Sequence, residues 1–177
     1  DRIVLLLTQE SEVVVAGVQT ERGVAMHFAH LLQYARPEVR LADLSSGNFA
    51  DVLASDRPGR CLVIVESRRY SRHAQLLAEH AQKAGIEIVF ITDKYCHWAR
   101  KLTPHVLALP TESAVFWTTM VPLVAALTLL ANGVVLSLGT KVEPRLERVS
   151  ELYQTFTGHV GNARRGRRDR RLLPHKS

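Results

Sequence analysis

The chain has 177 residues, of which 46% are apolar, 23% charged and 6% aromatic. This composition is typical of one globular domain and excludes a disordered or fibrous chain. The formal net charge of +6 comes from residues 161–177, which hold seven basic side chains and one acidic one, so that residues 1–160 hold 16 of each sign. A body without net charge excludes nucleic-acid binding over its whole surface.

The first residues and the cysteines indicate the cellular compartment of the protein. Residues 3–7 form too short an apolar run for a signal peptide, and a chain that begins without Met predicts a segment that precedes it. Cys61 and Cys96 fit neither a disulfide framework nor a zinc-ligand spacing. We therefore expect a reducing, cytoplasmic location, no metal and no cofactor.

Short apolar runs alternate with helical periods from residue 12 onward, which predicts an α/β fold with a parallel sheet and helices on both faces. The expected strands are residues 13–16, 39–42, 61–65, 86–91 and 106–109. The expected helices are residues 3–7, 24–35, 49–54, 74–81, a short stretch around residue 96, about 113–138 and 141–156. Residues 1–157 are predicted to form one domain, with Gly85 as a left-handed helix cap and residues 158–177 as a mobile basic tail.

Residues 113–140 carry no charge, and about 20 apolar residues can span a bilayer. Pro122, Gly133 and several hydroxyl residues interrupt this run, and a charged, strand-rich body precedes it. The sequence favours a helix buried in the core or at a subunit interface, with Leu127 and Leu130 among its contacts, over a membrane span.

Ligands of open α/β sheets bind beyond the carboxyl ends of the strands. Three loops qualify here, at residues 17–23, 66–72 and 92–95. The first lacks the full GxGxxG spacing of a dinucleotide-binding loop. In the second, Ser71 is placed to cap the following helix.

Three segments carry a resemblance to a known family. They are Cys-Leu-Val-Ile-Val-Glu-Ser-Arg-Arg-Tyr-Ser-Arg at 61–72, Ala-Gln-Lys-Ala-Gly-Ile-Glu-Ile-Val-Phe-Ile-Thr-Asp at 81–93, and Pro-Thr-Glu-Ser-Ala-Val-Phe at 110–116. They resemble the SIS (sugar isomerase) domain, the effector domain of RpiR-family transcription regulators, over roughly residues 3–155. The resemblance implies a three-layer α/β/α sandwich on a five-stranded, flavodoxin-like sheet. It also implies a homo-oligomer built partly on the long helix, a phosphosugar effector, and a DNA-binding helix-turn-helix domain that would precede these residues.

The resemblance also implies a set of ligand contacts. These are Thr20, Glu21, Glu66, Ser67, Arg68, Arg69, Ser71 and Glu112. Glu21, Glu66 and Arg68 stand where the family usually has serines that hold phosphate. A carboxylate repels a phosphate by roughly 4 kcal/mol for unit charges 4 Å apart at an effective dielectric of 20.

Three interpretations of this site remain open. Arg68 and Arg69 can replace the missing hydroxyls, because a guanidinium matches phosphate geometry. Alternatively, Glu21 and Glu66 face a ligand with hydroxyls or an amine. In the third interpretation Glu21 only stabilises the first turn of a helix and both arginines are solvated.

Other residues could also have a function. The pairs His27/His30 and His73/His80 have helical spacing, but no third ligand completes a metal site. Tyr95, Trp98, Phe116 and Trp117 could stack on a sugar, although packing is the simpler role. The arginines of the tail could bind polyanions.

The predicted function is the ligand-sensing domain of a transcription regulator, not an enzyme. The alternative is a sugar-phosphate aldose–ketose isomerase, which requires a general base and an acid at the sugar C1–C2 bond. The sequence places no such pair together, and a fold does not confer chemistry by itself.

Overall fold

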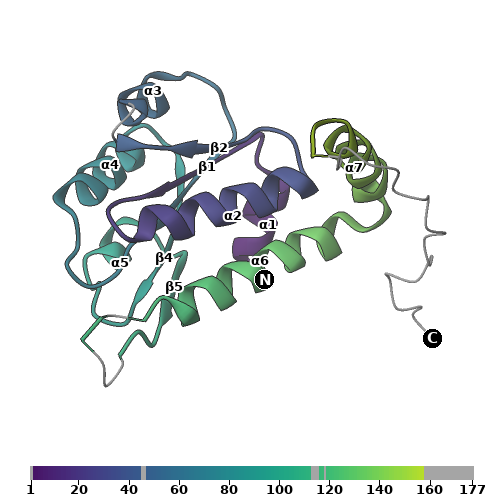
Figure 1. The fold of residues 1–177 in the computed structure, drawn as a ribbon. Coiled ribbons are helices and arrows are strands. Elements are labelled where there is room, and N and C mark those ends of the chain that lie inside the picture. Colours follow the sequence, from purple (N-terminus) through teal and green to yellow (C-terminus); the bar gives the residue numbers. More distant parts are fainter. Residues whose placement is uncertain (1, 45–46, 113–115, 118, 158–177) are drawn as a thin grey trace.

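The computed structural model describes residues 2–44, 47–112, 116–117 and 119–157. It confirms the predicted five-stranded parallel sheet, whose order is β2-β1-β3-β4-β5, with helices on both faces (Figure 1). The strands are β1 (Glu12–Gly17), β2 (Val39–Ala42), β3 (Arg60–Val65), β4 (Glu87–Asp93) and β5 (Val106–Leu109). This is the strand order of a flavodoxin-like fold. The direction in which successive strands are added across the sheet reverses between β1 and β3.

The helices divide into two layers. Those of the first layer are α1 (Arg2–Gln9), α2 (Glu21–Ala35) and α6 (Val121–Leu138), and those of the second are α3 (Asn48–Ala54), α4 (Arg72–Lys83) and α5 (Ala99–Leu102). Ser71 caps α4 as predicted, because its Oγ accepts a hydrogen bond from the backbone N–H of His73 at 3.2 Å. Gly85, which follows α4, has the predicted left-handed backbone with φ 70°.

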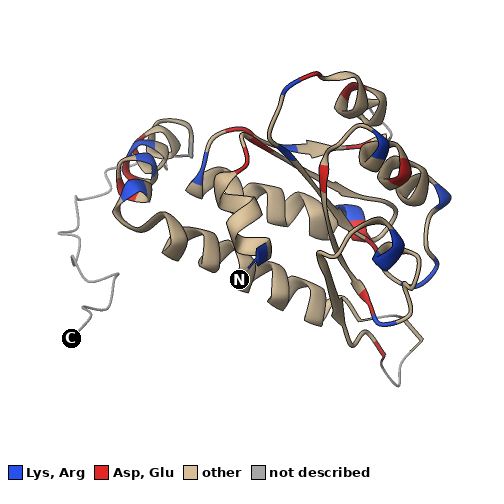
Figure 2. Cartoon of the chain, turned by 180° about the vertical axis from the view of Figure 1, so that it is seen from behind, with Lys and Arg blue, Asp and Glu red and all other residues tan. Residues whose placement is uncertain are grey.

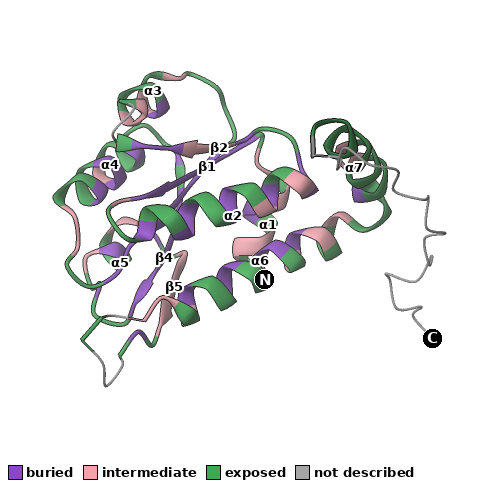
Figure 3. Ribbon diagram, in the orientation of Figure 1, coloured by how far each residue is buried: buried purple, intermediate pink, exposed green. Residues whose placement is uncertain are grey.

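Each face of the sheet has its own hydrophobic core. Successive strand residues point to opposite faces, so Val13 and Val15 of β1 pack under α2 and α6, whereas Val14 packs under α3 and α4. Phe28 anchors the first core and Phe90 the second, and neither side chain is exposed. The purple interior strands in Figure 3 show why the strand sequences are continuously apolar.

The long uncharged helix begins later than predicted and has a different buried face. α6 starts at Val121, and the preceding residues 113–115 and 118 lie outside the described part of the chain. Leu127 is fully buried in the core of its own chain, so its prediction as an interface residue is wrong. The opposite face presents Leu129 and Leu136, each 71% exposed.

Residues 121–156 are long and apolar enough to cross a membrane, with a mean hydropathy of 2.1 in their most apolar window, of which 22% is buried. Length and composition alone support this possibility. Within the chain, the buried side of α6 packs on α1 and α2, so the helix is a component of the first core. Its exposed side remains without a partner inside the described residues.

The last predicted helix is confirmed as a 3₁₀ turn, η2 (Gly139–Val142), followed by α7 (Glu143–Thr157). α7 extends beyond the sheet and carries charges of both signs (Figures 1 and 2). It contacts the end of α2, where Tyr153 stacks on Tyr34 with ring centroids 5.6 Å apart. Arg145 Nη2 also donates to the backbone oxygen of Gln33 at 2.6 Å. The predicted mobile tail, residues 158–177, lies outside the described residues.

Candidate functional site

The carboxyl ends of β1, β3 and β4 bring three loops to one edge of the sheet, as predicted. Gly17 ends β1 and allows the start of α2 to approach closely. A Cβ at this position would lie 2.6 Å from the backbone oxygen of Glu21 and 2.8 Å from the Cβ of Ala25. A residue without a side chain is therefore required here, and it fixes Glu21 against the end of β3.

Glu21 and Ser67 form the centre of the cluster. Glu21 is only 4% exposed and Ser67 only 1%. The Ser67 hydroxyl donates a hydrogen bond to Oε1 of Glu21, and Thr20 Oγ1 donates to Oε2 at 2.9 Å. Two of the hydroxyls predicted to contact a ligand are thus bound to a carboxylate of the protein itself.

Glu66 lies beside this pair and is 2% exposed. Its carboxyl group accepts hydrogen bonds from the backbone N–H groups of Ser71 and Ser67. Burial, followed by the charges of Glu21 and Asp93, nevertheless raises the pKa of Glu66 to about 8. Glu66 is therefore largely protonated at neutral pH, and a protonated carboxyl group does not repel a phosphate as a carboxylate would.

Asp93 completes the buried cluster from the end of β4. It is 2% exposed, and its Oδ1 accepts hydrogen bonds from the Tyr70 hydroxyl and, at 2.8 Å, from the backbone N–H of Tyr95. Burial and the Asp93 carboxylate raise the pKa of Tyr70, which keeps its phenol protonated. The sequence analysis placed residues 92–95 at this edge but assigned none of them to the site. A carboxylate at the end of a buried strand was the available signal.

Arg68, Tyr95, Lys94 and Glu112 form an outer layer. The guanidinium carbon of Arg68 lies 4.5 Å from the centroid of the Tyr95 ring, which is a cation–π contact. The Tyr95 hydroxyl donates to Oε1 of Glu112 at 2.6 Å, and Lys94 Nζ lies 2.5 Å from the same oxygen. These contacts, with that to Lys94 the largest, lower the pKa of Glu112 to about 2. Glu112 therefore belongs to the rim of the site and is separate from the buried carboxyl cluster.

Arg69 and Ser71 complete the predicted set. Arg69 is exposed and has a left-handed backbone with φ 77°, an uncommon conformation for a residue other than glycine. Ser71 is half-buried, and its hydroxyl caps α4. The structure thus brings Glu21, Glu66 and Ser67 together, places both arginines at the solvent boundary, and gives Ser71 a structural contact.

Two carboxyl oxygens of the cluster lack hydrogen-bond donors in the described part of the chain. Oε2 of Glu66 and Oδ2 of Asp93 are buried and accept no hydrogen bond from the described residues. Over the same ranges, no Lys, Arg or His forms an ion pair with Glu21, Glu66 or Asp93. Leaving a buried carboxylate oxygen without a donor is costly.

The histidine pairs and the aromatic residues named from the sequence form no ligand site within the described ranges. Among the described residues, no group of three His, Cys, Asp or Glu side chains is arranged to hold a metal ion. Trp98 is half-buried and packs edge-on against Phe90, with ring centroids 5.1 Å apart, so its role is packing. Phe116 and Trp117 are exposed and contact each other edge-on at 5.2 Å.

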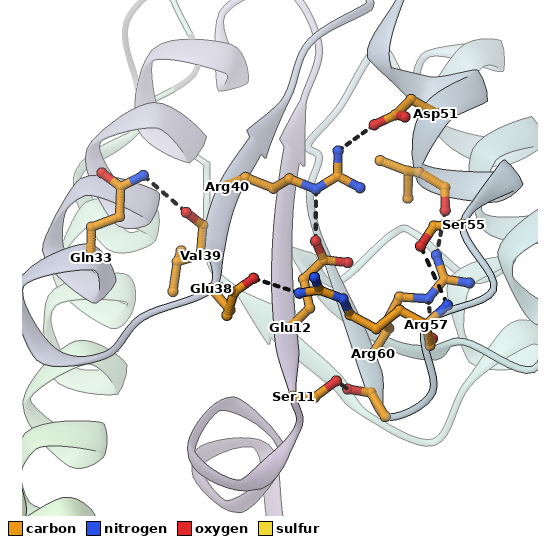
Figure 4. Close-up of polar contacts among 12 residues, drawn as sticks. Ser11, Glu12, Gln33, Glu38, Val39, Arg40, Asp51, Ser55, Arg57 and Arg60 are labelled. Atoms are coloured by element: carbon orange, nitrogen blue, oxygen red, sulfur yellow. Dashed lines mark hydrogen bonds and ion pairs between the residues drawn. The ribbon is translucent and has the colours of Figure 1, made fainter.

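The opposite edge of the sheet holds a second polar region, which the sequence analysis missed (Figure 4). Arg40 joins Glu12 at 2.9 Å to Asp51 at 2.5 Å, and Arg57 pairs with Glu38 at 2.5 Å. A groove of about 370 Å³ opens beside this network and is lined by residues 53, 55–60 and 84–86. These arginines are engaged by acidic side chains, which indicates a network that joins the amino ends of the strands.

Comparison with known proteins gives a family and several similar folds. Residues 6–133 match the SIS domain. The sugar isomerase domain of an RpiR transcription factor from Sphaerobacter thermophilus is similar in structure, with a TM-score of 0.78 and 21% identity over 85% of this chain and 84% of that chain.

Two further solved structures are similar to this chain. NanR from Vibrio vulnificus, complexed with ManNAc-6P, has a TM-score of 0.74 and 17% identity over 89% of this chain and 61% of that chain. A Methanococcus jannaschii protein, for which 3-hexulose-6-phosphate isomerase function is inferred from its crystal structure, has a TM-score of 0.61. Its identity is 11% over 84% of this chain and 81% of that chain. No curated protein matches the sequence. This chain spans less than two thirds of the length of NanR, and at these identities the likeness concerns the fold.

Proposed function

The chain belongs to the SIS domain family, and we propose that it is the ligand-sensing, oligomerising domain of a cytoplasmic transcription regulator of the RpiR type. Its effector is a phosphorylated carbohydrate bound at the carboxyl edge of the sheet. DNA is contacted by a helix-turn-helix domain outside this chain. The higher TM-scores of the two regulator structures, compared with the isomerase, support this choice.

The observation that carries the proposal is the position of Arg68. Its guanidinium lies over Tyr95 at the mouth of the buried cluster, and it forms no ion pair with a carboxylate of the described residues. Arg69 is adjacent and exposed. Two arginines without acidic partners offer planar donor groups that match phosphate, whereas the Ser67 and Thr20 hydroxyls are already bound to Glu21.

Oligomerisation is supported by the outer face of α6. Val121, Leu129 and Leu136 are each more than 70% exposed and follow one another at spacings of eight and seven residues, which places them on one side of the helix. Thr128 and Asn132 are also exposed on this side, so the face is apolar with two polar positions. Large exposed apolar side chains grouped in this way are typical of an interaction surface. In the proposal a second copy of the chain covers it.

One observation favours the alternative function, an aldose–ketose isomerase. A buried carboxyl group whose pKa is raised to about 8, as that of Glu66 is, resembles a general acid or base. The other two candidate carboxylates are less suited to proton transfer. Both oxygens of Glu21 accept hydrogen bonds, and the lowered pKa of Glu112 makes it a weak base.

A single incubation separates the two functions. The protein is mixed with a panel of hexose and pentose phosphates, and binding is followed by the thermal midpoint while conversion is followed by NMR of the sugar. If the protein is a sensor, at least one phosphosugar raises its thermal midpoint, and that sugar is chemically unchanged after the incubation. Aldose–ketose conversion that disappears in Glu66→Gln would establish the isomerase instead.

A further inference from the structure

Three buried carboxyl groups, those of Glu21, Glu66 and Asp93, lie together at the carboxyl edge of the sheet. All three side chains are almost fully buried, and the charges of Glu21 and Asp93 both act on Glu66. Within the described ranges, no Lys, Arg or His forms an ion pair with any of them. Like charges buried near one another cannot all ionise readily. The cluster therefore keeps a proton under conditions in which exposed carboxyl groups have lost theirs.

The hydrogen bonds of the cluster show which group holds this proton. Glu21 accepts hydrogen bonds from two hydroxyl groups, and Asp93 accepts one from the phenol of Tyr70. Donors of this kind favour a carboxylate. Two backbone N–H groups also reach Glu66, but burial and the two neighbouring charges outweigh them. The proton of the cluster therefore resides on Glu66.

Other charged or titratable side chains belong to the elements that pack around Glu66. They are Arg22 and Asp43 beside the start of α2, Arg68, Arg69 and Tyr70 in the loop after β3, Arg72 and His73 at the start of α4, and Lys94, Tyr95, Cys96 and Glu112 on the side of β4. The charged members are exposed or paired with one another, apart from Arg68 over Tyr95.

Two buried neighbours of Glu66 keep their protons in mildly alkaline solution. Burial raises the pKa of the Cys96 thiol, and burial together with the Asp93 carboxylate raises the pKa of the Tyr70 phenol. Both groups therefore stay neutral in the range in which Glu66 titrates. Glu66 is the buried group of this cluster whose charge changes there.

We infer that the proton on Glu66 regulates the site, so that a phosphosugar binds while Glu66 is protonated and is repelled once Glu66 ionises. This regulation rests on the proposed function, because it acts on the phosphosugar of the same site. Arg68, which the proposed function assigns to the phosphate, lies over Tyr95, and the backbone N–H of Tyr95 is bonded to Asp93. A phosphate at Arg68 is therefore near the carboxyl cluster, and a new negative charge on Glu66 weakens its binding.

Proton linkage gives the sign of the effect. A bound phosphate dianion disfavours the ionisation of Glu66 further, so the pKa of Glu66 rises in the complex. The complex then holds more protons than the free protein, and the affinity falls as the pH rises through about 8, the pKa of Glu66 in the free protein. A phosphate monoester has its second pKa at about 6, so the ligand keeps its charge above pH 7.

Isothermal titration with glucose 6-phosphate and with ribose 5-phosphate at pH 7, 8 and 9 tests this regulation. The Kd should rise about fivefold or more between pH 7 and pH 9, which is the change produced when binding raises the pKa of Glu66 by about one unit. At pH 8 binding should take up as much as about half a proton. This uptake is measured as a dependence of the apparent enthalpy on the ionisation enthalpy of the buffer, and circular dichroism verifies folding at each pH.

Two variants locate the effect. Glu66→Gln keeps the shape of the side chain but cannot ionise, so its Kd should change less than about twofold between pH 7 and pH 9 and its proton uptake should vanish. Glu147→Gln removes an exposed carboxylate of α7 and should keep the wild-type dependence. If Glu66→Gln does not fold, the proton uptake of the wild type still decides.

The outcomes separate this regulation from the proposed function. A Kd that is independent of pH, or proton release in place of uptake, would overturn the regulation and leave phosphosugar sensing intact. A pH dependence that persists in Glu66→Gln would overturn it as well. Failure of both sugar phosphates to bind at all three pH values would contradict the proposed function too.

Discussion

Ser67 Oγ at the end of β3 donates a hydrogen bond to the buried carboxylate of Glu21 in the first turn of α2. The contact joins two loops that are 46 residues apart in the sequence and sets the shape of the strand-end site. Glu21 also lies at a helix N-terminus, where a negative charge is favoured. A side-chain anion thus occupies the position at which a helix N-terminus could hold a ligand anion.

Replacing Ser67 by Ala should destabilise the fold by about 1–3 kcal/mol, because a buried carboxylate oxygen loses its donor. Urea unfolding measures the change in the free energy of unfolding. In a Glu21→Gln background the same replacement should cost less, since the acceptor no longer carries a charge. Additivity of the two substitutions to within about 0.5 kcal/mol would show that they do not interact.

Replacing Gly17 by Ala should destabilise the protein by about 1–3 kcal/mol, since the new Cβ would overlap the backbone of α2. Gly23 provides the matched control because it lies within α2 and a Cβ there meets nothing within 4 Å. Gly23→Ala should stabilise the helix by roughly 0.5–1 kcal/mol. Equal effects of the two substitutions on the thermal midpoint would contradict the close approach at Gly17.

The stability of the protein should depend on the protonation of Glu66. Its pKa is raised in the folded state to about 8, whereas an unfolded Glu titrates near 4.3. Between these values the folded state binds more protons, so the contribution of Glu66 to stability is complete below the unfolded pKa and is lost as the pH rises toward 8. A shift of this size corresponds to a few kcal/mol.

Urea unfolding of the wild type and Glu66→Gln between pH 5 and pH 8.5 measures this contribution. The free energy of unfolding should fall with pH more steeply in the wild type than in the variant. Glu147→Gln removes an exposed carboxylate of α7 and should follow the wild-type curve. Parallel curves for the wild type and Glu66→Gln would mean that Glu66 is already ionised at pH 5.

The outer face of α6 should hold two copies of the chain together. Leu129→Lys with Leu136→Lys places two charges on this exposed face, so light scattering should show a folded monomer where the wild type is a dimer or larger. Leu127→Lys buries a charge in the core instead and should unfold the chain. A monomeric wild type at tens of micromolar would contradict the proposed interface, and solubility that requires detergent would favour a membrane contact.

Periodicity was sufficient to predict the sheet, because strands covered on both faces are continuously apolar and helices carry an apolar stripe. The start of α6 was not predictable in this way. An uncharged run from residue 113 does not show where the helix begins, and the run does not distinguish the buried Leu127 from the exposed Leu129. That distinction depends on the direction in which the helix packs.

The candidate site was predicted only in part for a similar reason. Residue types and strand ends located Glu21, Glu66 and Ser67 correctly at one edge of the sheet. The sequence could not show that Ser67 bonds Glu21 or that Glu66 is buried deeply enough to stay protonated, because both depend on contacts between distant loops. Asp93 was missed although it is the last residue of the buried strand β4, the neighbour of the strand that Glu66 follows.

The most direct test of the account is an amide NMR titration of the protein with glucose 6-phosphate. The predicted result is a set of saturable shifts at the carboxyl edge of the sheet, at Glu21, Ser67, Arg68 and Tyr95, with the sugar unchanged at the end of the titration. The amino-edge groove around residues 55–60 and 84–86 serves as the internal control and should not respond. Saturable shifts at that groove, without shifts at the carboxyl edge, would contradict the central claim.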